Sequence, residues 1–199
     1  MKKKTVNTRF LVELAVLIAI EILLEVTGLG YIKTPFLEMT IMQVPVIVGA
    51  IVLGPLAGTI LGAVFGLTSF FECFGKSQFG ATLLGISPFS TFVVCVIPRL
   101  LMGLLCALVF KCLKGMKRTS LRCGAAGLCG ALFNTILFMG FLVTLFGKSD
   151  FIGGFIEQFG NGNILKFVVA FVGLQGLIEA IICCIVGASV SYALLKVKK

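Results

Sequence analysis

Residues 89–112, FSTFVVCVIPRLLMGLLCALVFKC, form an apolar stretch that is long enough to cross a bilayer. A membrane-spanning helix needs about 20 predominantly apolar residues, and this stretch meets that length. Basic residues end it and follow it: Lys111, Lys114, Lys117, Arg118 and Arg122. Two further basic groups lie near the chain ends: Lys2, Lys3, Lys4 and Arg9 at the start, and Lys196, Lys198 and Lys199 at the end.

The distribution of positive charge predicts how the chain is oriented. Lys and Arg that flank membrane spans are retained on the cytoplasmic side. The three basic groups hold twelve such residues, whereas four lysines fall on the other side of the predicted spans: Lys33, Lys76, Lys148 and Lys166. We therefore expect both termini to lie in the cytoplasm and the number of crossings to be even.

The composition predicts an integral membrane protein. The 199 residues are 59% hydrophobic and 13% charged, with a mean hydropathy of +1.15. A soluble domain of this size keeps a polar exterior and could not bury so much apolar surface. The net charge of +9 comes from basic residues at the ends of spans. This placement favours contact with anionic membrane lipid and argues against nucleic acid as a partner.

Apolar segments divided by polar loops predict an all-α bundle of six transmembrane helices. The expected helices cover approximately 10–27, 40–54, 56–72, 89–112, 121–146 and 164–195. A tight turn, Leu53-Gly54-Pro55-Leu56, joins the second and third helices on the inner face, because Pro suits the first turn of a helix. The expected outer loops are irregular and rich in Gly, Ser, Thr, Asn and Phe: 28–39, 73–88 and 147–163. We expect one transmembrane domain over residues 1–199.

Several residue types needed for catalysis or metal binding are missing from the sequence. The chain has no histidine, and its eight cysteines form no C-x-x-C pair. A zinc site or a Cys/His or Ser/His catalytic pair is therefore not expected. No G-x-x-x-x-G-K-[ST] loop for nucleotide phosphates is present. We expect no catalytic residues, no metal and no cofactor, and any uphill transport must draw its energy from elsewhere.

Polar residues in the middle of the predicted spans indicate a site. They are Arg99, Asn134, Thr135, Gln175 and Glu179. Such residues are costly in a bilayer, and Arg99 lies about 16 Å into its helix at 1.5 Å per residue. Two interpretations are open. Arg99 and Glu179 form an ion pair in a sealed bundle, or the group lines a cavity for a polar small molecule, where the guanidinium fork matches a carboxylate.

Other polar residues are placed toward the outer ends of the helices. We expect four hydroxyls, and one amide near the outer end of the second helix, to line a route into the cavity: Thr68, Ser69, Ser87 and Thr91, with Gln43. Three acids in the first helix are interpreted as interfacial or rim groups that reach water: Glu13, Glu21 and Glu25.

Small residues in two helices predict close packing. Glycine recurs every fourth residue in the third helix, at positions 54, 58, 62 and 66. Such a stripe lets another helix approach at short range. Ala15 and Ala19 form an A-x-x-x-A motif on one face of the first helix, which alone is a weak signal.

These features together resemble the substrate-binding S component of energy-coupling factor (ECF) vitamin transporters. The resemblance rests on six short helices with both ends inside, on Ala15 and Ala19, and on the stretch MQVPVIVGAIVLGP at 42–55. The chain looks most like the pantothenate-type members. Four stretches suggest this: IMQVP at 41–45, FGLTS at 65–69, IPR at 97–99 and GLIEA at 176–180.

The resemblance implies a working scheme. An S component of a prokaryotic plasma membrane captures a vitamin from outside the cell, in a pocket capped by its loops. A transmembrane coupling subunit and two ATPase subunits then reorient it. Ala15 and Ala19 would dock against the coupling subunit. Three alternatives stay open: a stand-alone ion-coupled transporter, an S component for riboflavin, pyridoxine or folate, and a membrane enzyme that uses Glu179 or Glu21.

Overall fold

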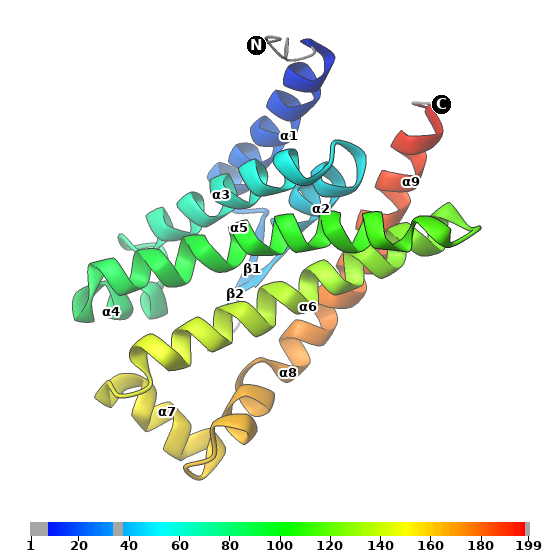
Figure 1. The fold of residues 1–199 in the computed structure, drawn as a ribbon. Helices are drawn as coiled ribbons and strands as arrows, with labels where there is room; N and C mark the ends of the chain where they lie inside the picture. Colours follow the sequence, from blue (N-terminus) through cyan, green and yellow to red (C-terminus); the bar gives the residue numbers. More distant parts are fainter. Residues whose placement is uncertain (1–7, 34–37, 198–199) are drawn as a thin grey trace, which may run out of the picture.

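The structure, a computed structural model, describes residues 8–33 and 38–197 of the chain. Lys2, Lys3, Lys4, Lys198 and Lys199 lie outside the described residues. The described part is predominantly helical (Figure 1). Its elements are α1 (Thr8–Thr27), β1 (Tyr31–Lys33), β2 (Glu38–Thr40), α2 (Gln43–Val52), α3 (Pro55–Glu72), α4 (Gln78–Ile86), α5 (Pro88–Cys112), η1 (Leu113–Gly115), α6 (Thr119–Phe146), α7 (Asp150–Gly160), α8 (Ile164–Ile182), η2 (Cys183–Gly187) and α9 (Ala188–Val197).

Four helical stretches in the described residues are long and apolar enough to cross a membrane. They are Pro55–Glu72, Pro88–Gly115, Thr119–Phe146 and Gln175–Val197, and two shorter apolar helices cover Gln43–Val52 and Ile164–Gly173. The first helix, α1, has 20 residues. Its four charged residues keep it out of this group, because charged side chains are costly in a span. The helical, membrane-spanning class is confirmed, and the number of six spans and their orientation stay predictions.

Two of the expected irregular loops contain helices, so that part of the prediction is wrong. The segment 73–88 holds α4, and the segment 147–163 holds α7. A serine side chain caps the N-terminus of each helix: Ser77 accepts a hydrogen bond from Gly80 N, and Ser149 accepts one from Ile152 N. A serine at this position satisfies a backbone N–H group of the first turn that has no partner within the helix.

The first outer segment also differs from the expectation of an irregular loop. The strands β1 and β2 pair antiparallel, with Tyr31 opposite Thr40. Because β2 extends to Thr40, α2 starts at Gln43, three residues later than expected. The turn after α2 follows the prediction: Gly54 adopts φ 102°, and Pro55 begins α3. A positive φ of this size favours glycine, which has no Cβ.

The glycine stripe brings α3 and α5 into backbone contact, as expected. A Cβ on Gly58 would lie 2.5 Å from the carbonyl oxygen of Gly103. One on Gly66 would lie 2.7 Å from the Cα of Val96, and one on Gly62 would clash with the carbonyl of Arg99. The position of Arg99 is therefore fixed by close packing of its own backbone against α3.

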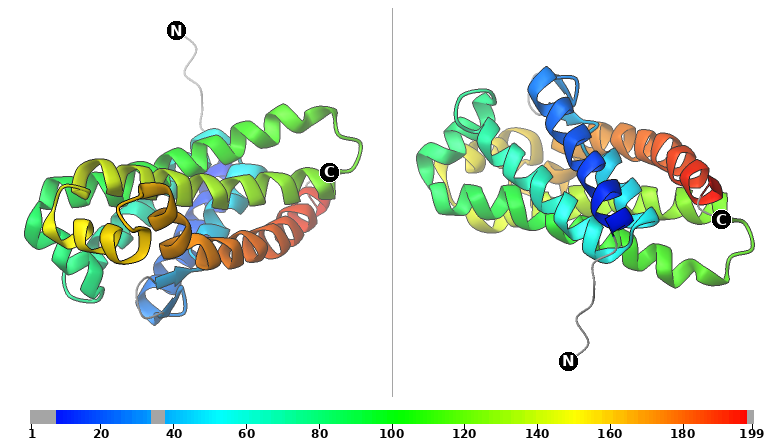
Figure 2. Two further views of the ribbon diagram at one scale, coloured as in Figure 1. Left: turned by 90° about the horizontal axis from the view of Figure 1, so that it is seen from below. Right: turned by 90° about the horizontal axis from the view of Figure 1, so that it is seen from above.

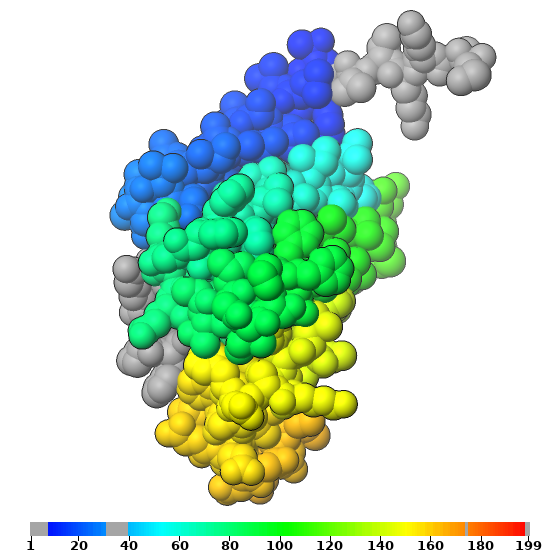
Figure 3. Space-filling model, turned by 90° about the vertical axis from the view of Figure 1, so that its left-hand side faces the viewer, coloured from blue at the N-terminus to red at the C-terminus, as the bar shows by residue number. Residues whose placement is uncertain are grey.

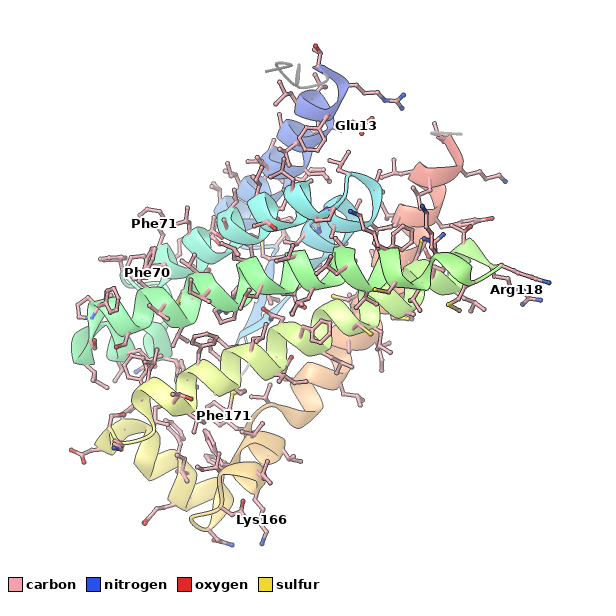
Figure 4. All side chains as sticks on the ribbon, in the orientation of Figure 1. Glu13, Phe70, Phe71, Arg118, Lys166 and Phe171 are labelled. Carbon is pink, nitrogen blue, oxygen red and sulfur yellow. The ribbon has the colours of Figure 1, made fainter. Side chains whose placement is uncertain are left out.

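The helices α5 and α6 run side by side through the molecule (Figures 1 and 2). At one end, α4 and α7 cover the bundle; at the other, η1 joins α5 to α6 near the end of α9. Figure 3 views the first of these ends, where the surface of α4 and α5 meets that of the α6–α7 segment. Arg118 and Lys166, which we expect on opposite membrane faces, lie at different ends of the molecule (Figure 4).

Three apolar clusters form the core, and Arg99 lies on α5 where they approach one another. One cluster joins α2, α5, α6, α8 and η2, and a second joins α4 to α8 at the end covered by α7. The third packs α1 against α2, α3 and α5. Val94 on one side of Arg99 belongs to the second cluster, and Met102 on the other side belongs to the third.

Candidate functional site

The Arg99 side chain supplies a hydrogen bond that the backbone of its own helix lacks. Pro98 lies inside α5 and has no N–H group, so the carbonyl of Val94 loses its helical partner. Arg99 Nη1 donates a hydrogen bond to that carbonyl oxygen at 2.8 Å. The side chain is buried, with 9% of its surface exposed. One nitrogen of the guanidinium is therefore bonded to the helix backbone, and this bond fixes the direction of the Arg99 side chain.

Two aromatic rings flank the charge of Arg99. Its Cζ lies 4.7 Å from the ring centre of Phe138 in α6 and 5.6 Å from that of Phe65 in α3. A cation over a ring face is attracted by the ring quadrupole, and Arg is the commonest partner. The Nε atom is buried and has no hydrogen-bond partner among the described residues. Within the same residues Arg99 makes no ion pair, so its charge has no direct counter-ion.

Glu179 in α8 is held by the segment that leads into α2. Its Oε1 accepts a hydrogen bond from Thr40 N at 2.8 Å, and its Oε2 accepts one from Gln43 Nε2 at 2.8 Å. Gln175 lies one turn earlier in α8, on the same face as Glu179. The ion pair between Arg99 and Glu179, the alternative that would seal the bundle, is not formed.

Gln43, which we expected to line the route near the outer end of the second helix, is fully buried. It begins α2, and the hairpin before it carries it inward against α8 and η2, where Cys183 Sγ lies 3.9 Å from its Oε1. Gln43 thus lies at the start of α2, and its role in lining the route stays a prediction.

Asn134 and Thr135 lie on α6, opposite α8. Asn134 is 6% exposed, and its Oδ1 has no hydrogen-bond partner among the described residues. Thr135 Oγ1 donates to the carbonyl of Ala131 at 3.2 Å. A Cβ on Gly176 in α8 would lie 3.3 Å from Thr135 Oγ1. Phe138, which contacts Arg99, follows Asn134 by one turn. The two atoms with unused hydrogen-bonding capacity, Arg99 Nε and Asn134 Oδ1, thus belong to helices that Phe138 connects.

The four expected route-lining hydroxyls lie in α3, in α5 and at the cap of α5. Thr68 Oγ1 donates to the carbonyl of Phe65 at 2.9 Å, and Thr91 Oγ1 donates to that of Ser87 at 2.9 Å. The Ser87 side chain caps α5 by accepting from Ser90 N. Ser69 is half-buried, and Thr91 is fully buried. Thr68 and Thr91 thus donate within their own helices, and their oxygens keep acceptor capacity.

The interpretation of the α1 acids as solvated groups is wrong for Glu21. Glu21 is fully buried, and neither carboxylate oxygen has a hydrogen-bond partner among the described residues. Glu25 accepts from Lys76 Nζ at 3.1 Å, and Glu13 pairs with Arg9 at 2.7 Å. Glu21 and Glu25 are four residues apart and share the face of α1 that packs against the bundle, which is why they are buried together.

Ala15 and Ala19 lie on the uncovered face of α1. Both are exposed, and large apolar side chains surround them on the same surface. These neighbours are Leu11, Val12, Val16, Ile20 and Leu23. The described chain leaves this face for lipid or for another protein.

Three residues of the site were missed by sequence reasoning: Thr40, Phe65 and Phe138. The spacing of Phe138 from Asn134 was an available signal, because residues four apart share a helix face. Thr40 gives no such signal, because it acts through its backbone N–H group. Among the described residues, no three metal-binding side chains gather at one place.

The sequence was compared with known proteins. The family described as "ECF transporter, substrate-specific component" matches residues 9–191. The chain belongs to this family. Because the family consists of transport subunits, the interpretation as a membrane enzyme is set aside. The match spans α1 to α9 and includes Arg99, Asn134 and Glu179.

Two curated relatives carry names that specify a vitamin. The S component described here is 29% identical over 198 residues to the pantothenic acid transporter PanT of Lactococcus lactis, covering 93% of both chains. It is 28% identical over 204 residues to the pantothenate transporter PanT of Leuconostoc mesenteroides, covering 96% of this chain and 94% of the relative. The predicted resemblance to pantothenate-type S components is thereby confirmed.

Proposed function

We propose that this S component captures pantothenate outside a prokaryotic cell and delivers it to an ECF-type importer. The chain would act as one substrate-binding domain over residues 1–199, in the plasma membrane with both termini in the cytoplasm. The names of two relatives support the choice of vitamin. The observation that carries the proposal is the buried Arg99, whose charge has no counter-ion and whose Nε has no partner among the described residues.

The chemistry of pantothenate fits these groups. The vitamin carries one carboxylate, one amide and two hydroxyls. A carboxylate that accepts from Arg99 Nε and a free Nη hydrogen would neutralise the buried cation, and charge-assisted hydrogen bonds of this kind are the stronger ones. Asn134 Oδ1 would accept from a hydroxyl or the amide N–H. An unpaired charge at mid-membrane is costly. A ligand that pairs with the charge removes this cost, and its affinity rises accordingly.

Thr135, Gln175 and Glu179 line the α6–α8 side of the proposed site. Glu179 is occupied by Thr40 and Gln43. We expect it to fix the entry to α2 in place and to form the wall of the pocket. Gln43, Thr68, Ser69 and Thr91 complete the set of side chains that we assign to the substrate.

The transport step would come from partner subunits. A transmembrane coupling subunit would dock against Ala15 and Ala19, where short side chains allow helices to approach closely. Two ATPase subunits would supply the energy. The uncovered apolar face of α1 around these alanines supports the proposal.

The test is a thermal-unfolding screen of the purified chain in detergent with pantothenate, riboflavin, pyridoxine and folate. A ligand present at 100 times its Kd raises the free energy of unfolding by about 2.7 kcal/mol. We expect pantothenate to raise the midpoint and the other three to leave it unchanged. A shift with another vitamin and none with pantothenate would reassign the substrate.

A further inference from the structure

Two buried cysteines are in contact at the end of the bundle covered by α4. Cys73 is the first residue after α3, and Cys95 lies in the second turn of α5. Their Sγ atoms are 3.9 Å apart, and both thiols are free. The exposed fractions of the two residues are 5% and 6%. On α5, Cys95 lies beside the backbone contact at Gly66, whereas Cys73 follows Gly66 by about two turns.

The pair needs little movement to become a disulfide. A disulfide has an S–S distance of about 2.05 Å, so the sulfurs would have to approach by about 1.9 Å. Close packing at Gly66 prevents the helices from approaching there. Cys73, however, caps the C-terminal end of α3 and is the first residue of the turn 73–76. Side-chain rotation together with a shift of this helix end can close the gap.

Movement of Cys73 acts directly on α4. A Cβ on Gly80 would lie 2.6 Å from Cys73 Sγ, so α4 rests on this thiol. The neighbouring Phe79 packs its ring 5.7 Å from that of Phe151 in α7 and 6.1 Å from that of Phe171 in α8. Phe171 lies among the aromatic side chains that join these helices (Figure 4). The position of Cys73 is thus coupled to the helices that cover this end of the bundle.

The pair also borders the proposed binding site. Cys95 precedes Arg99 by one turn of α5, and its neighbour Val94 holds the guanidinium through its carbonyl oxygen. The thiol pair therefore lies between α4, which covers the bundle, and the buried cation.

We propose that Cys73 and Cys95 form a reversible disulfide when the protein meets a peroxide, and that this bond holds α4 in place and slows ligand exchange. One thiolate attacks an oxygen of hydrogen peroxide, the O–O bond breaks, hydroxide leaves and takes up a proton to give water, and the sulfur becomes a sulfenic acid. The second thiol attacks that sulfur and expels water. With hydrogen peroxide, two thiols and one peroxide give one disulfide and two waters, and a dithiol reverses the change. The effect on ligand exchange rests on the proposed function, whereas bond formation does not.

The chain offers a direct readout of the bond. Trypsin cleaves after Lys33, Lys76 and Arg99, so Cys73 and Cys95 fall in separate peptides, 34–76 and 77–99, that contain no other cysteine. After treatment with hydrogen peroxide and alkylation of the remaining thiols, mass spectrometry should find these peptides linked. Reduction should separate them. If both cysteines are recovered alkylated from peroxide-treated protein, the proposal is wrong.

Variants separate this pair from other thiols. Cys73→Ser and Cys95→Ser should each abolish the linked peptides. Cys106→Ser is the matched control, because Cys106 is also buried in α5 but its Sγ donates to the carbonyl of Ala126. This variant should still form the link. Linkage of 34–76 to another cysteine peptide in wild-type protein would contradict the assignment.

The rate at which labelled pantothenate is released tests whether the disulfide slows ligand exchange. Oxidised wild-type protein should release the vitamin roughly fivefold or more slowly than reduced protein, a coupling of ordinary size for two linked sites. The Cys73→Ser/Cys95→Ser double variant should show no change with peroxide. A disulfide that leaves the release rate unchanged would overturn the coupling. Reduced protein that binds no pantothenate would instead contradict the proposed function, while the peptide result stands.

Discussion

Arg99 Nη1 donates to the carbonyl oxygen of Val94, the acceptor that Pro98 leaves without a helical partner, at 2.8 Å. The proline therefore does more than bend a helix, because it supplies an anchor that orients a buried guanidinium. Phe65 and Phe138 flank the charge, and Nε has no partner among the described residues. An anchored cation with unused donors is suited to bind an anion.

Replacement of Arg99 by Gln should weaken pantothenate binding while the protein stays folded. Hydrogen bonds to charged groups contribute about 1.5–3 kcal/mol, which corresponds to roughly 10- to 150-fold in Kd. The amide of Gln keeps a donor near the Val94 carbonyl, so we expect the unfolding midpoint without ligand to change little. Titration of the variant with labelled pantothenate measures the loss. An unchanged Kd would remove Arg99 from the site.

Replacement of Pro98 by Ala should remove the hydrogen bond between Arg99 and the Val94 carbonyl and keep the charge of Arg99. Ala supplies an N–H group for the Val94 carbonyl and removes the proline clash, so we expect the unfolding midpoint to rise. Arg99 then loses its fixed direction, and pantothenate affinity should fall although the charge remains. Raised stability with unchanged affinity would show that the anchor does not serve binding.

Asn134→Ala should reduce pantothenate affinity and leave the apo protein folded. The Oδ1 atom of Asn134 has no hydrogen-bond partner among the described residues. Removing this atom therefore costs the apo protein no hydrogen bond within that part of the chain. Thr144→Ala is a matched control on the same helix, because Thr144 is exposed and its hydroxyl donates only to the carbonyl of Gly140. If Asn134→Ala unfolds the protein, Asn134 has a structural role and not a binding role.

Replacement of Glu21 by Leu should stabilise the protein. The Glu21 carboxylate is buried and has no partner in the described part of the chain, which is unfavourable, whereas Leu of similar size would join the apolar cluster between α1 and α3. Each kcal/mol corresponds to about 2–4 °C in Tm for a chain of this length. Glu13→Leu is the control, since Glu13 is partly exposed and paired with Arg9. A lower Tm for Glu21→Leu would show that the carboxyl group serves a polar partner.

Replacement of Ala19 by Trp should block assembly and leave vitamin binding unchanged. The bulky ring would keep the coupling subunit away from the exposed face of α1. Leu128→Trp is the control, because Leu128 is also exposed but lies on α6 and not on the exposed face of α1. Co-purification with the three partner subunits measures assembly. Normal assembly of Ala19→Trp would contradict the docking proposal.

The sequence predicts the apolar helices because they follow from local composition. It does not predict the partners of Glu179, because the bond to Thr40 joins residues 139 apart through a backbone N–H group. The burial of Glu21 was missed for a related reason. Its place near the end of α1 suggested water, but the side of the helix it occupies faces α2 and α3, which only the packing of the bundle decides.

Two helices, α4 and α7, carry a short polar signal just before their first residue. Ser77 and Ser149 each stand immediately before a helix that the sequence analysis described as a loop. Each serine was a recognisable N-cap. Glycine and phenylalanine around them favoured the loop interpretation, and the aromatic contacts between Phe79, Phe151 and Phe171 that stabilise α4 and α7 are tertiary.

Calorimetric titration of the purified chain with pantothenate and with panthenol tests the central claim most directly. Panthenol carries an alcohol in place of the carboxylate and keeps the amide and the two hydroxyls. If Arg99 binds the carboxylate, pantothenate should bind roughly 10-fold or more tightly than panthenol, the loss expected for a charged hydrogen bond. Equal affinity for the two compounds would contradict the account.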